Sequence, residues 1–209
     1  MITKIHARWA RRAVRRASNG CRALLAGILL LSIHADIQAA AIVLSKPVPL
    51  RAETLAQIRQ ARTEGDPAWK LIVFGFTHCK DVCPMSLANL SLLVKAAADE
   101  RIRLGGVFVT VDPDRDTNDV LSGYAKSFGA DIAYLRFEGD HLERFKAAFG
   151  VETVFYTKNA GNMSHYQVDH STTAFLVDPG GNIRVMFDAL KDVEDIAGIL
   201  RGNKALFGS

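Results

Sequence analysis

Two cysteines, Cys79 and Cys83, stand where an apolar run gives way to a stretch with helical periodicity. The run Leu71–Phe76 is rich in β-branched and aromatic residues, and Pro84, a residue tolerated in a first helical turn, opens the next segment. Residues four apart on a helix lie about 5–6 Å from each other at Cβ. The positive end of the helix dipole and the neighbouring Lys80 both favour thiolate over thiol. Two thiolates in this setting would bind a soft metal ion or exchange disulfides.

A plain structural disulfide is the third interpretation of this pair. The sequence holds three cysteines, and Cys21 would leave with the N-terminal segment if that segment is cleaved. A lone pair of cysteines in an oxidising compartment often forms a bridge. However, a bridge that encloses three residues removes little chain entropy and stabilises the fold weakly. We therefore favour a chemical role over a structural one.

The remaining sequence predicts alternating strands and helices. Apolar runs and alternation predict strands at 71–76, 104–111, 134–137, 153–157, 164–168, 173–177 and 183–187. Apolar periodicity and capping residues predict helices at 53–62, 85–98, 117–128, 141–149 and 193–200. This order predicts an α/β fold, a thioredoxin-like sandwich with a β-hairpin inserted late in the chain. The cysteines would lie at its first strand-to-helix junction, where open α/β sheets bind ligands.

A histidine would extend the metal chemistry of the two thiolates. Copper(I) is soft and prefers thiolate, and imidazole is an acceptable further ligand that copper(II) needs. His170 shortly precedes the strand at 173–177, which in a thioredoxin-like sheet lies beside the first strand-to-helix junction. We therefore expect His170 to lie within reach of both sulfurs. His78, His141 and His165 are more typical of solvated side chains.

Five further residues surround this expected site. Asp169 is predicted either to orient the ring of His170, as carboxylates near metal ligands often do, or to form a turn. Tyr166 and Phe76 are predicted to wall the site or to pack in the core. Met85 and Met163 carry thioethers, but core packing and surface exposure are the simpler interpretations of their positions.

The first 41 residues differ from the rest in charge. They hold seven of the 26 basic residues and one of the 22 acidic residues of the 209-residue chain, which leaves 19 basic and 21 acidic residues and a net charge of −2. A domain of this charge has no general electrostatic reason to bind nucleic acid.

We divide the chain into three parts. Residues 1–41 have a basic start, an apolar core at Ala23–Ile33 and small residues at Ala39–Ala41, the pattern of a signal peptide or an N-terminal membrane tether. Residues 42–70 form an N-terminal segment without a clear pattern, and residues 71–209 form the thioredoxin-like domain. Such a leader predicts export to the periplasm or the outer face of the inner membrane. The arginine-rich composition also allows the mitochondrial inner membrane, on its intermembrane-space side.

Three segments in this order resemble the Sco family of copper chaperones for cytochrome c oxidase assembly. They are Phe74–Pro84, which reads Phe-Gly-Phe-Thr-His-Cys-Lys-Asp-Val-Cys-Pro, Val111–Thr117, which reads Val-Asp-Pro-Asp-Arg-Asp-Thr, and Val168–Ser171, which reads Val-Asp-His-Ser. The resemblance covers about residues 71–200. It implies a thioredoxin-like fold with a hairpin insertion ahead of the histidine.

The resemblance also implies a site and a function. Cys79, Cys83 and His170 would bind copper, as Cu(I) or Cu(II), and pass it to the dinuclear copper site of a cytochrome c oxidase subunit. A copper donor chaperone and a thiol reductant would be further partners, near or tethered to the membrane. A metallochaperone of this kind is not an enzyme.

A thiol-disulfide oxidoreductase is the alternative function. In that case Cys79 and Cys83 are a redox-active catalytic pair, in which Cys79 attacks a partner's disulfide and Cys83 resolves the mixed disulfide. Thioredoxin-type enzymes use a two-residue spacer and a cis-proline facing the cysteines. This chain has a three-residue spacer and His170 in that region, so we favour the chaperone.

Overall fold

The computed structural model describes residues 41–63, 65, 67–157, 161, 165–191 and 193–207. The predictions for residues 1–40 and Met163 therefore lie outside the described residues, as does most of the connection between the predicted hairpin strands at 153–157 and 164–168. None of the helices within the described ranges combines the length and the apolar character needed to cross a bilayer.

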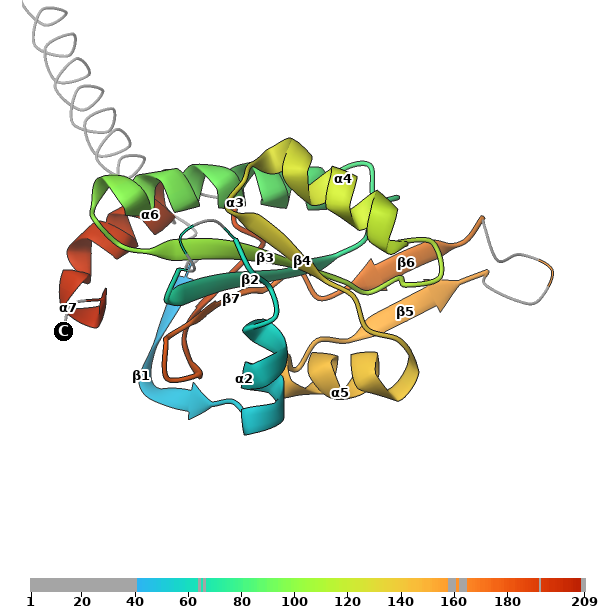
Figure 1. Cartoon of the computed structure of the whole chain (residues 1–209), viewed down its shortest axis with the longest axis horizontal. Coiled ribbons are helices and arrows are strands. Elements are labelled where there is room, and N and C mark those ends of the chain that lie inside the picture. The colour runs from blue at the N-terminus through green and yellow to red at the C-terminus, as the bar shows by residue number, and fades with distance from the viewer. Residues whose placement is uncertain are drawn as a thin grey trace, which may run out of the picture. The chain divides into compact units, whose positions relative to one another are not determined.

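A six-stranded sheet forms the centre of the fold (Figure 1), in the order β1-β8-β7-β2-β3-β4. Its strands are β1 (Ala41–Pro49), β2 (Trp69–Gly75), β3 (Leu104–Thr110), β4 (Ile132–Leu135), β7 (Ala174–Val177) and β8 (Asn182–Phe187). The strands β2, β3 and β4 run parallel, whereas β7 pairs antiparallel with β2 and β8 antiparallel with β7. Every residue of β2 and β3 is buried, which is why both strands are almost entirely apolar, with Lys70 of β2 as the charged exception.

Helices cover both faces of this sheet (Figure 1). On one face lie α3 (Val82–Asp99), α4 (Asn118–Phe128) and α6 (Val193–Gly202), and on the other lie α2 (Ala52–Ile58) and α5 (Gly139–Phe149). A short helix, α7 (Lys204–Phe207), follows α6. This α/β arrangement is the predicted fold class.

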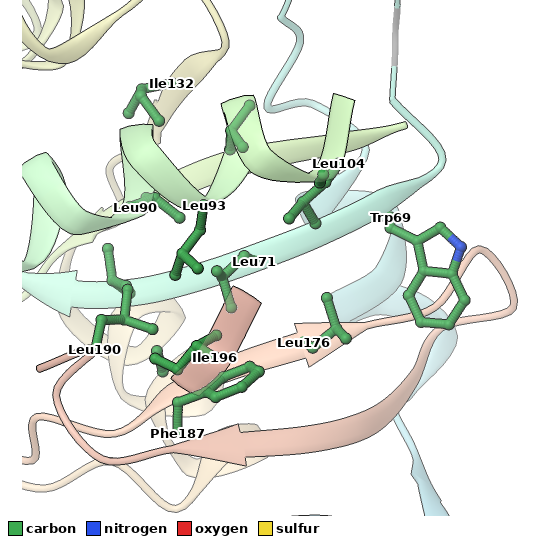
Figure 2. Close-up of a cluster of buried hydrophobic side chains, with 14 of the residues drawn as sticks. Trp69, Leu71, Leu90, Leu93, Leu104, Ile132, Leu176, Phe187, Leu190 and Ile196 are labelled. Carbon is green, nitrogen blue, oxygen red and sulfur yellow. The ribbon is translucent and has the colours of Figure 1, made fainter. Parts of the chain in front are cut away.

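Two apolar clusters join the helices to the sheet, one on each face. Figure 2 shows part of the cluster beneath α3, where Leu90 and Leu93 meet Leu71 of β2 and Leu176 of β7. Ile72 belongs to the opposite cluster because successive strand residues point to opposite faces. Side chains on both sides therefore hold β2, the strand that leads to the cysteines.

A second, two-stranded sheet is the predicted hairpin insertion. It consists of β5 (Thr153–Tyr156) and β6 (Gln167–His170), which pair antiparallel, with Thr153 opposite His170. The strand β6 begins and ends later than the predicted strand at 164–168. As a consequence His170 is the last residue of β6 and not a linker residue before β7.

The segment 42–70 contains two elements at its start. The strand β1 pairs with β8 and forms one edge of the sheet, with an irregular register between Val43 and Val48. This strand was not predicted, because Pro47 and Pro49 argue against a strand in a sheet interior, although an edge strand tolerates them. The helix α2 ends at Ile58, four residues earlier than predicted.

Candidate metal centre

The two cysteines lie on either side of the start of α3. Cys79 is in the turn after β2, where its backbone N–H donates to the carbonyl of Phe76 over 3.3 Å. Cys83 is in the first turn of α3, and its N–H donates to the sulfur of Cys79 over 3.4 Å. Both side chains are free thiols. The backbone of Cys83 at the helix start therefore already holds the sulfur of Cys79.

The two thiols differ in acidity. Burial acts to raise the pKa of Cys79, but hydrogen bonds from the backbone N–H groups of Asp81, Cys83 and Val82 outweigh it, so this pKa is lowered. Burial raises the pKa of Cys83 strongly, because that side chain is only 3% exposed. The prediction that both residues favour thiolate is thus wrong for Cys83 in the metal-free protein. At Cys79 the lowering comes from backbone N–H groups at the helix start.

Gly75 gives the sulfur of Cys83 room beside β2. A Cβ atom at position 75 would lie 2.9 Å from the Sγ of Cys83 and 2.8 Å from an edge carbon of Phe108. Real Cβ atoms essentially never approach heavy atoms this closely, so a side chain here would displace the sulfur or the ring. Gly75 belongs to the first of the three sequence motifs, but only the packing in the structure gives it this role.

His170 brings its ring to the buried sulfur. Its Nε2 lies 3.6 Å from the Sγ of Cys83, and its Nδ1 lies 2.9 Å from the carbonyl oxygen of Ser171. Since a carbonyl oxygen only accepts, Nδ1 carries the proton and the lone pair of Nε2 faces the sulfur. Burial lowers the pKa of His170, although the Ser171 hydrogen bond and the charge of Asp169 act in the opposite direction. The ring is therefore neutral at pH 7, which is the form that binds metals.

The distance between the Cys83 Sγ and the His170 Nε2 suits a metal ion bound by both atoms. Metal bonds of about 2.3 Å to sulfur and about 2.0 Å to nitrogen, at a tetrahedral angle, would hold the two atoms about 3.5 Å apart. Cys83 and His170 are close to that separation. Among the described residues no three His, Cys, Asp or Glu side chains are already gathered as a complete cluster. Cys79 is the available third donor, since its sulfur accepts the N–H of Cys83 in the same turn.

A buried carboxylate anchors the cysteine loop from below. Asp116 is fully buried and accepts hydrogen bonds from the Thr77 backbone N–H over 3.1 Å and from the Thr77 hydroxyl over 2.5 Å. The hydroxyl of Thr110, the last residue of β3, donates over 2.6 Å to the Asp116 carboxylate oxygen that also accepts the Thr77 N–H. Asp116 therefore ties the turn before Cys79 to the end of the neighbouring strand.

Of the two aromatic residues predicted either to wall the site or to pack in the core, Phe76 contacts the ring of His170, whereas Tyr166 contacts Arg115. Phe76 and Tyr166 are both buried, and the rings of Phe76 and His170 meet edge to face with centroids 5.9 Å apart. The guanidinium carbon of Arg115 lies 3.8 Å from the centroid of the Tyr166 ring. The motif that contains Arg115 gives no local indication of this contact with Tyr166.

The other candidate residues lie outside the gathered donors, by which we mean Cys79, Cys83 and His170. The side chain of His78 is 52% exposed, and its Nδ1 is 3.8 Å from a carboxylate oxygen of Asp116. His141 and His165 are exposed, and so is Met85. Neither of the two roles predicted for Asp169, orienting the ring of His170 or forming a turn, is observed. Asp169 is exposed within β6, and the carbonyl of Ser171 holds Nδ1 of His170.

Sequence comparison connects this chain to proteins of known family. Residues 48–204 match the sequence model of the family described as SCO1/SenC. A SCO2-like protein of Rickettsia felis is 33% identical over 135 residues, which are 64% of this chain and 64% of that protein. A SCO2-like protein of Rickettsia prowazekii is 37% identical over 113 residues, 53% of this chain and 54% of that protein. The chain thus spans between about half and two thirds of the length of these relatives.

Solved structures of similar fold include proteins with bound copper. The copper-bound crystal structure of ScoI from Arabidopsis thaliana has a TM-score of 0.59 at 27% identity, over 66% of this chain and 84% of that chain. The copper-bound structure of yeast Sco1 has a TM-score of 0.61 at 27% identity, over 68% and 78% of the two chains. Apo Sco1 from Thermus thermophilus has a TM-score of 0.62 at 26% identity, over 78% and 95%. These similarities support the thioredoxin-like assignment of the fold.

Proposed function

Because the chain belongs to the SCO1/SenC family, we propose that it is a metallochaperone that binds copper through Cys79, Cys83 and His170. The observation that carries this proposal is the 3.6 Å separation of Cys83 Sγ and His170 Nε2. Relatives of similar fold are known with copper bound, which supports copper as the ion. Copper here is the cargo of the protein.

The donor set fits both oxidation states of copper. Two thiolates suit soft copper(I), and a neutral imidazole adds the harder donor that copper(II) accepts. A cysteine side chain has one torsion with three staggered positions, so Cys79 can turn its sulfur toward the other two donors. Binding releases the proton of the Cys83 thiol, because only the thiolate is a ligand.

We further propose that the acceptor is the dinuclear copper site of a cytochrome c oxidase subunit. Thiolates of the acceptor would replace Cys79 and Cys83 one at a time, so that the ion stays coordinated throughout the transfer. The half-exposed Cys79 would exchange first, because the buried Cys83 is less accessible. Residues 1–41 would export the protein or tether it to the membrane on the side where this acceptor lies.

The experiment that tests this proposal is metal analysis combined with transfer. Protein purified under reducing conditions should bind one copper ion per chain, and the Cys83→Ser variant should bind none stably. Loaded protein should then pass copper to a reduced copper-site domain of the oxidase subunit. Unchanged copper stoichiometry in Cys83→Ser would contradict the site.

A thiol-disulfide oxidoreductase is the second candidate, favoured by the unequal acidity of the two cysteines. In this reaction the Cys79 thiolate attacks one sulfur of a partner's disulfide, and the other partner sulfur leaves as a thiolate. Deprotonated Cys83 then attacks the Cys79 sulfur of the mixed disulfide, which releases the second partner thiol and leaves a Cys79–Cys83 disulfide. Rapid turnover of a disulfide substrate by metal-free protein, with a reductant to regenerate the thiols, would favour this function.

A further inference from the structure

The guanidinium of Arg115 connects the loop after β3 to the strand that carries His170. Its Nε lies 2.5 Å from a carboxylate oxygen of Asp112, and one Nη donates to the backbone carbonyl of Tyr166 over 3.0 Å. The same guanidinium lies over the Tyr166 ring, 3.8 Å from its centroid. The Tyr166 hydroxyl donates to the other oxygen of Asp112 and so closes the arrangement.

The other neighbour of this guanidinium is a wall of the metal centre. The guanidinium carbon of Arg115 lies 5.6 Å from the centroid of the Phe76 ring. Phe76 in turn meets the His170 ring edge to face at 5.9 Å. Arg115 thus lies between the turn that leads to the cysteines and the strand that ends at His170.

We propose that Asp112, Arg115 and Tyr166, named here the Arg115 clamp, position His170 against the cysteines and thereby set the affinity for copper(II). This inference rests on the copper site proposed above. Arg115 is a positioning residue in this account, since it acts on the ligand through the Tyr166 backbone and the Phe76 ring.

The clamp is needed because the hairpin has little support of its own. A two-stranded hairpin in isolation is marginally stable in water, and β5 and β6 form a sheet separate from the main one. On the β5 side, the buried Lys146 of α5 donates to the Thr153 hydroxyl over 2.5 Å. The clamp holds Tyr166, the residue just before β6 and four residues before its histidine.

The chemistry of the clamp is specific to arginine. Asp112 is fully buried, so its charge needs a partner at short range. A planar guanidinium donates along its edge while its face lies on an aromatic ring, which an ammonium group does not do in the same way. Lysine at position 115 would therefore keep the charge near Asp112 but lose either the carbonyl bond or the stacking.

The test compares Arg115→Gln with Arg136→Gln. Arg136 donates to the carbonyls of Asp116 and Pro113 in the same loop, but it approaches from the side of β4. Loss of a hydrogen-bonded partner behind a metal ligand typically lowers metal affinity about 10–100-fold. We expect a loss in this range for copper(II) in Arg115→Gln, a smaller loss for copper(I), and wild-type copper(II) affinity in Arg136→Gln. Wild-type copper(II) affinity in a folded Arg115→Gln would overturn the inference.

A second measurement needs no copper. In metal-free protein labelled at histidine, the ring resonances of His170 should move in Arg115→Gln, because the ring current of Phe76 depends on their mutual geometry. Tyr166→Phe removes only the hydroxyl bond to Asp112 and should move the His170 resonances in the same direction. This second variant keeps the test available if Arg115→Gln does not fold. Unmoved His170 resonances in both variants would refute the clamp. If the wild type bound no copper, the proposed function would fail, yet this measurement would still decide the positioning.

Discussion

The sulfur of Cys83 and the Nε2 of His170 lie 3.6 Å apart, although 87 positions separate the two residues along the chain. Removing the ring should therefore change copper binding selectively. We expect His170→Ala to lower copper(II) affinity by more than about tenfold, because loss of a mere hydrogen-bond partner of a ligand already costs about 10–100-fold. Copper(I) affinity should fall less, since two thiolates remain. Competition titrations with each ion would measure both effects.

His141→Ala is the matched control for that change, because His141 is exposed on α5 and lies outside the gathered donors. It should leave both copper affinities unchanged. Equal loss in the two variants, or no loss of copper(II) in His170→Ala, would remove His170 from the site.

The two cysteines should react at different rates with iodoacetamide. Backbone N–H groups lower the pKa of Cys79, whereas burial raises the pKa of Cys83. In metal-free protein at pH 7 we expect Cys79 to be alkylated first, with a rate that reaches its plateau at lower pH than for an ordinary thiol. Mass spectrometry of peptides at timed intervals would measure this. Equal labelling of the two residues would contradict the asymmetry.

Gly75→Ala should disturb the site from the strand beneath it. The new Cβ would lie 2.9 Å from the Cys83 sulfur, and overpacking of this kind typically costs about 1–3 kcal/mol. We expect a lower free energy of unfolding in urea and weaker copper binding. Gly123→Ala is the control, because position 123 in the helix α4 has open space, and there alanine should stabilise by about 0.5–1 kcal/mol. Destabilisation of similar size in both variants would show that the contact with Cys83 is irrelevant.

The stability of metal-free protein should depend on pH through His170. Burial lowers the pKa of His170 in the folded protein, so the unfolded chain binds this proton more tightly. Below about pH 6.5, the ordinary histidine pKa, protonation therefore favours the unfolded chain and stability falls. Above that pH the contribution is fully present. The difference in unfolding free energy between wild type and His170→Ala should shrink from pH 7.5 to pH 5.5, and a constant difference would contradict the shift.

Asp116→Asn should loosen the cysteine loop. One carboxylate oxygen accepts from the Thr77 hydroxyl and the other from the Thr110 hydroxyl, and the Thr77 backbone N–H donates to both. An amide group replaces one of these acceptors with a donor. A buried group left without its partner costs about 1–3 kcal/mol. We expect that loss of stability and faster hydrogen exchange at the Thr77 amide. The exposed Asp119 provides the control as Asp119→Asn, and unchanged exchange at Thr77 in Asp116→Asn would refute the anchor.

Most elements of the fold could be predicted from local sequence. Buried strands such as β2 and β3 are predominantly apolar, and the helices α4 and α5 show clear apolar periodicity. The edge strand β1 could not be predicted, because its prolines and half-exposed residues show no alternation of apolar and polar side chains. Only its pairing with β8 makes it a strand. The boundaries of the hairpin moved for the same reason, since the end of β6 depends on its register with β5.

The candidate site divides in the same way. The types and spacing of Cys79, Cys83 and His170 were legible in the chain, because a strand-to-helix junction and soft donors are local features. Their acidity was not, since the burial that raises the pKa of Cys83 comes from side chains distant in sequence. The role of Arg115 was equally hidden, because its guanidinium reaches Tyr166, which lies 51 residues later in the chain. Local sequence therefore determined which side chains could act as metal ligands. The tertiary structure decided the protonation of the two thiols and the imidazole and the distances between them, because both depend on the groups that folding places beside each side chain.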